Sequence, residues 1–565
     1  MDISTLTIYN LPASPPNWDK VGVFYISYAA IWTTVVLAGM AFCLHNRHLP
    51  ILRIRGLPLS FGSVFFLHLY WIMAQITYPI GRTLPLVIAY DVQYFVMGMW
   101  LPLGIALFHA ANLRFLRVAK LQKQFTHPDA RRKRGCDGEK TSWFCKIRNM
   151  EYTQKVLSFI VTGMVIQCIL CIGMWLACKK YHPSFGIPGT EIRGATLPEQ
   201  LIDLGRGWEW WPSVLWQLIW TWMVAPVLIW RAWGINDTMG WRTQTIGACL
   251  SGLHATPMFL IASYVPVFNK INVYFTPSQW IHLNTMFIEI FTVFVPVFQV
   301  IKLRYLRKQV TINEHWETDS QAVPTHTSDP SGRKGSAIEL IEKNKMLEYI
   351  TEHNGDRLLT MNALNRVLDE HPVPLQEFSA HHDFSGENIA FLTRVSKLKT
   401  SITPKSTKSQ DLDIYNEALN IYINFISPRT ADFPLNLSSR SLKALESIFE
   451  ASATSVCGGP TVDPALPFLT EVLSGRQGSQ KSDSSGSTLH SRYTGDIPGL
   501  FHPGVFDEAQ SHIKSLVLTN TWPKFVREMQ MRQRRESEDS DGSGFTDSSD
   551  ATIVSRITMF IRRLA

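Results

Sequence analysis

Residues 280–308, WIHLNTMFIEIFTVFVPVFQVIKLRYLRK, are an apolar run that ends in a cluster of lysines and arginines. A helix of about 20 apolar residues is long enough to cross the hydrocarbon core of a bilayer. Basic residues beside a span favour the cytoplasmic side of the membrane. This stretch therefore predicts a membrane-spanning helix whose C-terminal end lies in the cytoplasm.

Six earlier stretches of the 565-residue chain have the same apolar character. The seven expected spans lie near residues 21–45, 58–80, 85–110, 155–178, 211–232, 243–267 and 280–302. Basic loops follow the first and third spans, whereas the alternate loops are poor in lysine and arginine. The positive-inside rule then places the N-terminus outside and everything after residue 303 in the cytoplasm. The first span is too long for a cleavable signal peptide, and no positive cluster precedes it.

Glu289 lies near the middle of the seventh predicted span. A carboxyl group at that depth is costly, so its side chain should face the interior of the helix bundle and contact a polar group. His254 and His68 are the candidate partners, and Asp91 is a further polar candidate nearer the outer surface. Two interpretations stay open: a buried structural hydrogen bond, or a site for a ligand or a proton.

The eight cysteines do not form a disulfide framework or a metal site by their spacing. Cys168 and Cys171 have the CxxC spacing, but they lie inside an apolar run and no second pair accompanies them. We therefore predict no metal and no cofactor.

The C-terminal half is polar and carries helical periodicity. We expect a seven-transmembrane domain over 1–308, a linker over 309–336, a helical domain over 337–530 and a tail over 531–565. The helical domain should contain helices within 338–350, 360–371, 372–382, 382–399, 413–426, 438–452 and 506–530, with a Ser/Gly-rich insert near 474–496 and a break near Trp522-Pro523. The acidic, serine-rich tail should end in a basic amphipathic helix over 551–565. The predicted fold class is all-α throughout.

Four segments of the C-terminal half carry a resemblance to a known family: DFSGENIAFL, ALNIYINFI, FPLNLSSRS and FDEAQSHIKSLVLTNTWPKFV, in this order. Over residues 343–530 the chain resembles a regulator of G-protein signalling (RGS) domain. With the seven spans, it resembles the seven-transmembrane RGS proteins of fungi and plants.

The resemblance implies that the chain accelerates GTP hydrolysis by a Gα subunit, with no catalytic residue, and that it is not itself an enzyme. The residues that it implies for Gα binding are Glu387, Asn388, Asn436, Leu516, Asn520 and Lys524. These six should cluster on one exposed end of the domain. Leu392 stands where the family usually has tryptophan, Asn520 where aspartate is common, and Lys524 where arginine is common, so the choice of Gα is left open.

Two other functions remain as alternatives. The seven helices could form a receptor that couples a ligand to Gα, with the RGS part as a built-in brake, or a transporter that uses Glu289. The expected partners are GTP-bound Gα, the lipid bilayer and an unknown extracellular ligand, with no role for nucleic acid. The expected location is the plasma membrane, with endosomes as a second location, and the RGS domain in the cytoplasm.

Overall fold

The computed structural model describes residues 7–126, 152–205, 207–321, 359–402, 408–457 and 492–541. In these residues the chain is all-α, as predicted, with one isolated β-bridge between Cys178 and Ile187. The predicted helix over 338–350, the insert near 474–496 and the helix over 551–565 lie wholly or mostly outside the described residues.

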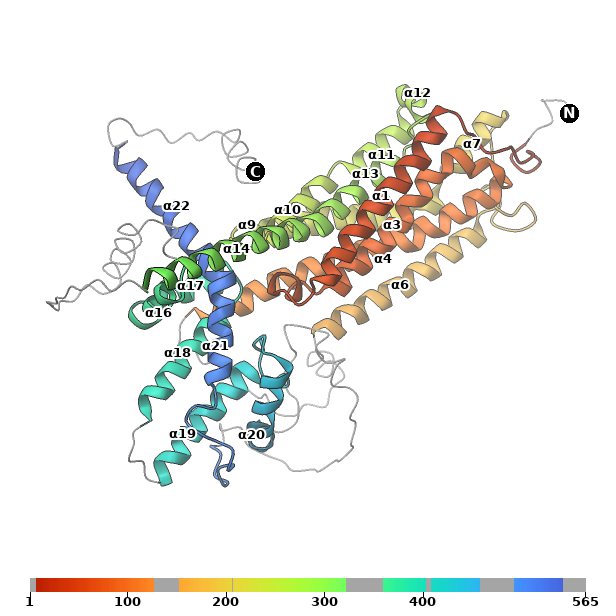
Figure 1. Cartoon of the computed structure of the whole chain (residues 1–565). Coiled ribbons are helices and arrows are strands. Elements are labelled where there is room, and N and C mark those ends of the chain that lie inside the picture. The colour runs from red at the N-terminus through yellow and green to blue at the C-terminus, as the bar shows by residue number, and fades with distance from the viewer. Residues whose placement is uncertain are drawn as a thin grey trace. The chain divides into compact units, whose positions relative to one another are not determined.

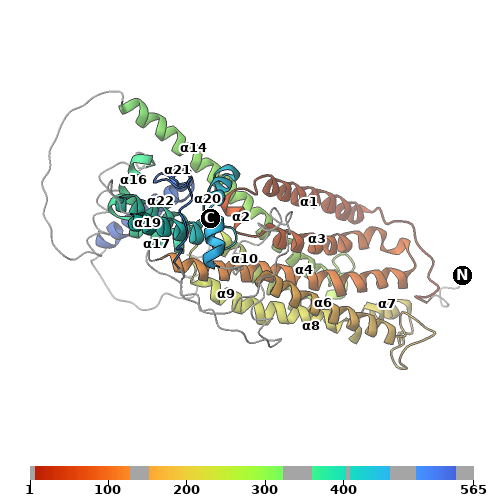
Figure 2. The ribbon, with the colours of Figure 1, turned by 90° about the horizontal axis from the view of Figure 1, so that it is seen from below.

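Within the described residues, seven helical segments are long and apolar enough to cross a membrane, which makes the chain a multi-pass membrane protein by length and composition. They are Lys20–His45, Leu57–Thr83, Leu86–Phe125, Lys155–Ala177, Leu197–Trp233, Trp241–Tyr264 and Gln279–Thr311. Each overlaps one predicted span. The first four contain α1 (Lys20–His45), α3 (Leu57–Ile80), α4 (Leu86–Gln122) and α6 (Tyr152–Ala177), which run alongside one another in both views (Figures 1 and 2).

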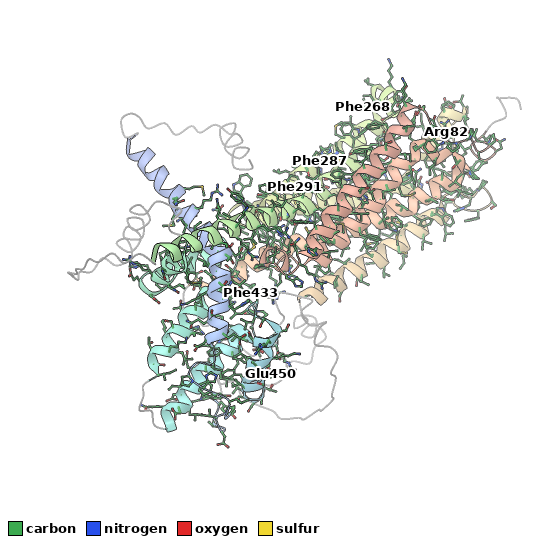
Figure 3. All side chains as sticks on the ribbon, viewed as in Figure 1. Arg82, Phe268, Phe287, Phe291, Phe433 and Glu450 are labelled. Carbon is green, nitrogen blue, oxygen red and sulfur yellow. The ribbon has the colours of Figure 1, made fainter. Side chains whose placement is uncertain are left out.

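The last three spans are built from shorter helical pieces. The fifth contains α7 (Leu197–Gly205), α8 (Trp211–Leu218), the π-helix η5 (Ile219–Val224) and α9 (Ala225–Trp233). The sixth contains α10 (Trp241–Gly252) and α11 (Ala255–Tyr264), and the seventh contains α13 (Gln279–Glu289), the π-helix η7 (Ile290–Phe294) and α14 (Val295–Gln321). Phe287 and Phe291 lie on α13 and η7 (Figure 3).

The chain divides into two compact units. The bundle unit comprises Met1–Arg117, Glu139–Ile235 and Met239–Val300. The helical unit comprises Ile301–Ala565 together with two short segments from earlier in the chain, Val118–Gly138 and Asn236–Thr238.

The helical unit contains the helices that the C-terminal sequence pattern predicts. They are α16 (Met361–Glu370), α17 (Pro372–His381), α18 (Gly386–Ser401), α19 (Lys408–Ile421) with η9 (Tyr422–Ile426), α20 (Ser439–Cys457), α21 (Asp507–Leu516), η11 (Val517–Thr521) and α22 (Trp522–Asp541). Their apolar faces meet in one core that includes Phe391, Tyr415, Phe449 and Trp522, all almost fully buried. Phe433 and Glu450 belong to this unit (Figure 3).

Two local predictions are wrong. The chain is not broken at Trp522-Pro523: α21, the π-helix η11 and α22 follow one another without a gap, and Pro523 is the second residue of α22. The segment expected as a linker from residue 309 begins as helix, since α14 continues to Gln321, and neither glycine nor proline occurs between residue 309 and Pro324.

Candidate functional site

A fully buried carboxylate, Asp383, lies just before α18 in the helical unit. Its Oδ1 accepts hydrogen bonds from Lys524 Nζ at 2.6 Å and from Thr238 Oγ1 at 2.7 Å. Its Oδ2 accepts from Thr521 Oγ1 at 2.7 Å and from Ser385 Oγ at 2.9 Å. A buried charge is tolerated when it is paired and its lone pairs are hydrogen-bonded. We call these five residues the Asp383 network.

The loop that carries Asp383 turns sharply between α17 and α18. The backbone N–H groups of His382 and Asp383 both donate to the Phe378 carbonyl, and that of Ser385 donates to the Ser379 carbonyl. Phe384, which is buried, has a φ of 47°, an uncommon value for a bulky residue. Burial lowers the pKa of the neighbouring His382, so its ring stays neutral near pH 7. The loop is therefore held in one conformation by its surroundings.

Lys524 and Asn520, both predicted to contact Gα, lie one helical turn apart and touch. Lys524 Nζ donates to Asn520 Oδ1 at 3.2 Å in addition to its bond with Asp383. The sequence analysis singled out Asn520 and Lys524 but missed Asp383, which is the counter-charge of Lys524. The expectation that all six candidates are exposed is wrong for Asn520, which is buried against the loop before α18.

The other four candidates are half-buried and lie at the edges of the same unit. Glu387 and Asn388 are in the first turn of α18, directly after the loop of Asp383. The backbone carbonyl of Asn436 accepts a hydrogen bond from His512 Nε2 at 3.0 Å, and His512 is one turn before Leu516 on α21. The structure thus links Asn436 to His512, the first of four residues spaced four apart: His512, Leu516, Asn520 and Lys524. The last of them, Lys524, is linked through Asp383 to the start of α18.

Glu289 forms a second polar cluster, inside the bundle unit. Its side chain is fully buried at the end of α13. One oxygen lies 2.9 Å from His68 Nδ1 on α3, and the other accepts from Trp32 Nε1 on α1 at 2.6 Å. His68 Nε2 lies 3.0 Å from Thr33 Oγ1. The prediction of an inward-facing carboxyl with a polar neighbour is confirmed.

Of the polar groups considered as neighbours of Glu289, only His68 is its partner in the structure. His254 lies between α10 and α11, with its ring perpendicular to that of Phe287 at a centroid distance of 6.4 Å, and its buried Nε2 has no hydrogen-bond partner among the described residues. Asp91, on α4, accepts a hydrogen bond from Trp175 Nε1 at 2.8 Å. A sequence can identify which polar residues lie within spans, but it does not show which of them meet.

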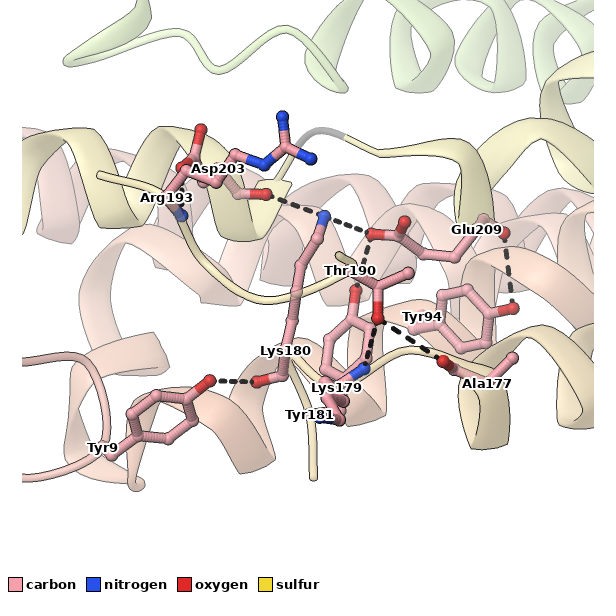
Figure 4. A network of polar contacts seen from close by, with 10 residues as sticks. All are labelled: Tyr9, Tyr94, Ala177, Lys179, Lys180, Tyr181, Thr190, Arg193, Asp203 and Glu209. Atoms are coloured by element: carbon pink, nitrogen blue, oxygen red, sulfur yellow. Dashed lines mark hydrogen bonds and ion pairs between the residues drawn. The ribbon is translucent and has the colours of Figure 1, made fainter. Parts of the chain in front are cut away.

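A third cluster, which the sequence analysis did not predict, ties the segment between the fourth and fifth spans to the bundle (Figure 4). Lys180 Nζ lies 2.8 Å from Glu209 Oε1, and both side chains are buried. Lys180 Nζ also donates to the Asp203 carbonyl, and its own carbonyl accepts from Tyr9 Oη. Tyr94 Oη donates to the Cys171 carbonyl and, at 3.4 Å, to that of Glu209. An acidic residue between tryptophans, in the stretch GWEWWP, was the only signal in the sequence.

Among the described residues, no group of three or more histidine, cysteine, aspartate or glutamate side chains could hold a metal ion. Comparison with protein-family models, with curated proteins and with solved structures finds no significant match to this chain. The function of the chain therefore has to be inferred from its own residues.

Proposed function

We propose that this membrane protein accelerates GTP hydrolysis by a Gα subunit, and that the surface around the Asp383 network binds Gα. The observation that carries the proposal is that Lys524 and Asn520 are tied through Asp383 to the start of α18, where Glu387 and Asn388 lie. Segments more than a hundred residues apart in the sequence are thus joined by hydrogen bonds into one surface. The order of the four sequence motifs on which the resemblance to an RGS domain rests also supports the proposal.

The proposed mechanism needs no chemistry from this chain. A Gα subunit carries its own arginine and its own water-orienting glutamine. A rigid surface that fits the switch segments best in their transition-state arrangement accelerates the reaction by differential binding. Each tenfold gain in rate requires only about 1.4 kcal/mol of such preference. The buried, four-fold hydrogen-bonded Asp383 keeps the surface rigid, and half-buried Glu387, Asn388 and Asn436 supply polar contacts.

Single-turnover GTP hydrolysis by candidate Gα subunits, with the full chain in lipid nanodiscs, tests this proposal. We expect the wild-type chain to raise the hydrolysis rate and Asn436→Ala to reduce that acceleration by about tenfold or more, the loss of one polar transition-state contact. Asn424→Ala is the matched control, because Asn424 is exposed on η9 and its side chain bonds only within its own helix. If Asn436→Ala leaves the hydrolysis of every tested Gα unchanged while wild type is active, the assigned surface is wrong. If wild type accelerates none, the function is wrong.

A second candidate function rests on the Glu289 cluster. A carboxyl group paired with an imidazole inside a membrane span is a common feature of ligand and proton sites. The bundle unit would then be a receptor or a transporter, with the helical unit as its regulator. Nucleotide exchange on Gα, measured with the full-length protein, tests the receptor, and proton or solute flux in liposomes tests the transporter. The absence of both activities would leave the Glu289 cluster as a structural element.

A further inference from the structure

We propose that residues 122–126 of the helical unit bind the same surface that Gα would use, so that the domain regulates itself by covering its own partner surface. The inference rests on the proposed function, because it names what controls that surface. All the contacts that carry it lie within the helical unit, which includes Val118–Gly138 and Asn236–Thr238.

Gln122 binds the start of α18 with both ends of its amide. Its Nε2 donates to Glu387 Oε2 at 2.9 Å, and its Oε1 accepts from the Gly386 backbone N–H at 3.1 Å. The Gln122 side chain is fully buried. A free N–H group at a helix start and an adjacent carboxylate are the donor and acceptor that a Gα contact would use, and here one amide satisfies both.

Phe125 packs the segment against apolar side chains of the helical unit. Its ring lies 6.2 Å from that of Phe425 and 5.8 Å, edge to face, from that of Phe433, and it packs against the core of the helical unit. Its backbone carbonyl accepts a hydrogen bond from Gln376 Nε2, which also donates to the Gly386 carbonyl at 3.0 Å. A Cβ added at Gly386 would lie 2.8 Å from Phe125 Cβ, so glycine is required for this close approach.

The segment touches both loops that carry predicted Gα contacts. Gln122 contacts Gly386 and Glu387 at the start of α18, where Asn388 also lies. Phe125 and Gln124 contact Phe433 and Asp432, in the loop that also carries Asn436. A Gα subunit that contacted Glu387 and Asn436 together would meet this segment between them, and both cannot occupy the surface at once.

A second short segment closes the other side of the loop before α18. The Thr238 backbone N–H donates to the His382 carbonyl at 2.8 Å, and its hydroxyl donates to Asp383. The sequence predicted Glu387 as an exposed contact, whereas in the structure its carboxylate already has a partner in Gln122. In this structure the helical unit is therefore in its covered form.

Removing residues 122–126 from this surface should raise the activity of the chain on Gα. A binding surface that is free only a tenth of the time weakens the apparent affinity about tenfold, and removal of the cover restores that factor. In nanodisc-reconstituted full-length protein, we expect Gln122→Ala/Phe125→Ala to increase the affinity for Gα loaded with GDP and aluminium fluoride by about tenfold. Gln122→Glu provides an independent variant, because it sets a second carboxylate against Glu387 without removing any buried apolar surface. Lys123→Ala is the matched control, since its side chain is exposed in the same segment.

A second measurement tests the cover without any Gα. Hydrogen–deuterium exchange of the 383–388 peptide should accelerate in Gln122→Ala/Phe125→Ala and in Gln122→Glu, and should not change in Lys123→Ala. Unchanged exchange in both opening variants would overturn the cover. Faster exchange with equal Gα affinity in wild type and variants would overturn the competition while the proposed function stands. Faster exchange in the variants, when neither wild type nor any variant binds or activates a Gα subunit, would overturn the proposed function and the regulation that depends on it.

Discussion

At the residue scale, two buried carboxylates are stabilised in two different ways. Asp383 has one ammonium group and three hydroxyl groups as partners, whereas Glu289 has an imidazole and an indole N–H. Apart from Ser385, which lies two residues from Asp383, each partner comes from a distant part of the sequence, so the carboxylate also holds elements together. Removing one partner leaves a group that burial has already stripped of water.

We expect Lys524→Met to destabilise the helical unit by about 3–5 kcal/mol, because Asp383 would remain buried without its counter-ion. Asp383→Asn combined with Lys524→Met should recover most of that loss, since no buried charge remains. Pulse proteolysis in urea, followed by fragments of the helical unit, measures the change in the free energy of unfolding. Lys443→Met, at an exposed position on α20, should have no measurable effect. Equal stability of Lys524→Met and Lys443→Met would show that the ion pair contributes little.

We expect Glu289→Ala to lower the stability of the bundle unit by about 1–3 kcal/mol, since Trp32 Nε1 and His68 lose a buried acceptor. Glu289→Gln should retain much of the stability, because its amide oxygen can still accept a hydrogen bond. Thermal unfolding of the detergent-solubilised protein and the amount of protein at the cell surface are the readouts. Wild-type stability together with altered signalling in Glu289→Ala would instead favour a ligand or proton site.

At the element scale, the spans pack closely where one helix presents glycine. A Cβ built at Gly104 on α4 would lie 2.6 Å from Leu67 Cγ on α3, and one at Gly247 on α10 would lie 2.4 Å from the Phe291 ring. Without a hydrophobic driving force between helices in lipid, such close packing is a main source of association. Two π-helices lie at the polar clusters. The π-helix η7 directly follows Glu289, and the π-helix η11 contains Asn520 and Thr521.

We expect Gly104→Val to destabilise the bundle unit by about 1–3 kcal/mol, because the added atoms would force α3 and α4 apart. Gly163→Val on α6 is the matched control, since no heavy atom lies within 4 Å of a Cβ built there. Both substitutions introduce the same β-branched residue into a membrane-spanning helix, so their difference isolates the contact. Thermal unfolding in detergent checks the prediction, and equal melting temperatures for the two variants would contradict it.

At the scale of the whole molecule, the proposed function joins a partner-binding unit to seven potential spans in one chain. A membrane-held domain and a lipid-anchored Gα on the same bilayer meet at a high effective concentration. The bundle unit would then contribute to activity even without a ligand of its own.

We expect full-length protein in vesicles to accelerate GTP hydrolysis by vesicle-bound, lipid-modified Gα at a concentration about 10²-fold lower than is needed for the same Gα without its lipid. The acceleration reached at saturation should be the same for both, because anchoring changes encounter and leaves the transition state as it was. Dependence on lipid modification is measured by titrating both forms of Gα at constant vesicle area. Identical concentration dependence would show that anchoring has no role in this activity.

The sequence by itself determined the properties that depend on neighbouring residues. Apolar length predicted the seven spans, and helical periodicity predicted where α16 to α22 lie, because both patterns are local; it did not predict that α22 continues to Asp541. The cost of a carboxyl group in a span was sufficient to predict that Glu289 faces inward.

Only the tertiary structure decided which residues meet. Lys524 and Asp383 are 141 positions apart, and Glu289 and His68 are 221 positions apart, so no periodicity relates them. A buried polar residue needs a partner, but helix packing selects it from several candidates of equal chemistry. Packing pairs Glu289 with His68 and not with His254, Lys524 with Asp383, and Gln122 with Glu387. Sequence patterns predict burial because burial follows from local composition, whereas partners follow from how distant segments close on one another.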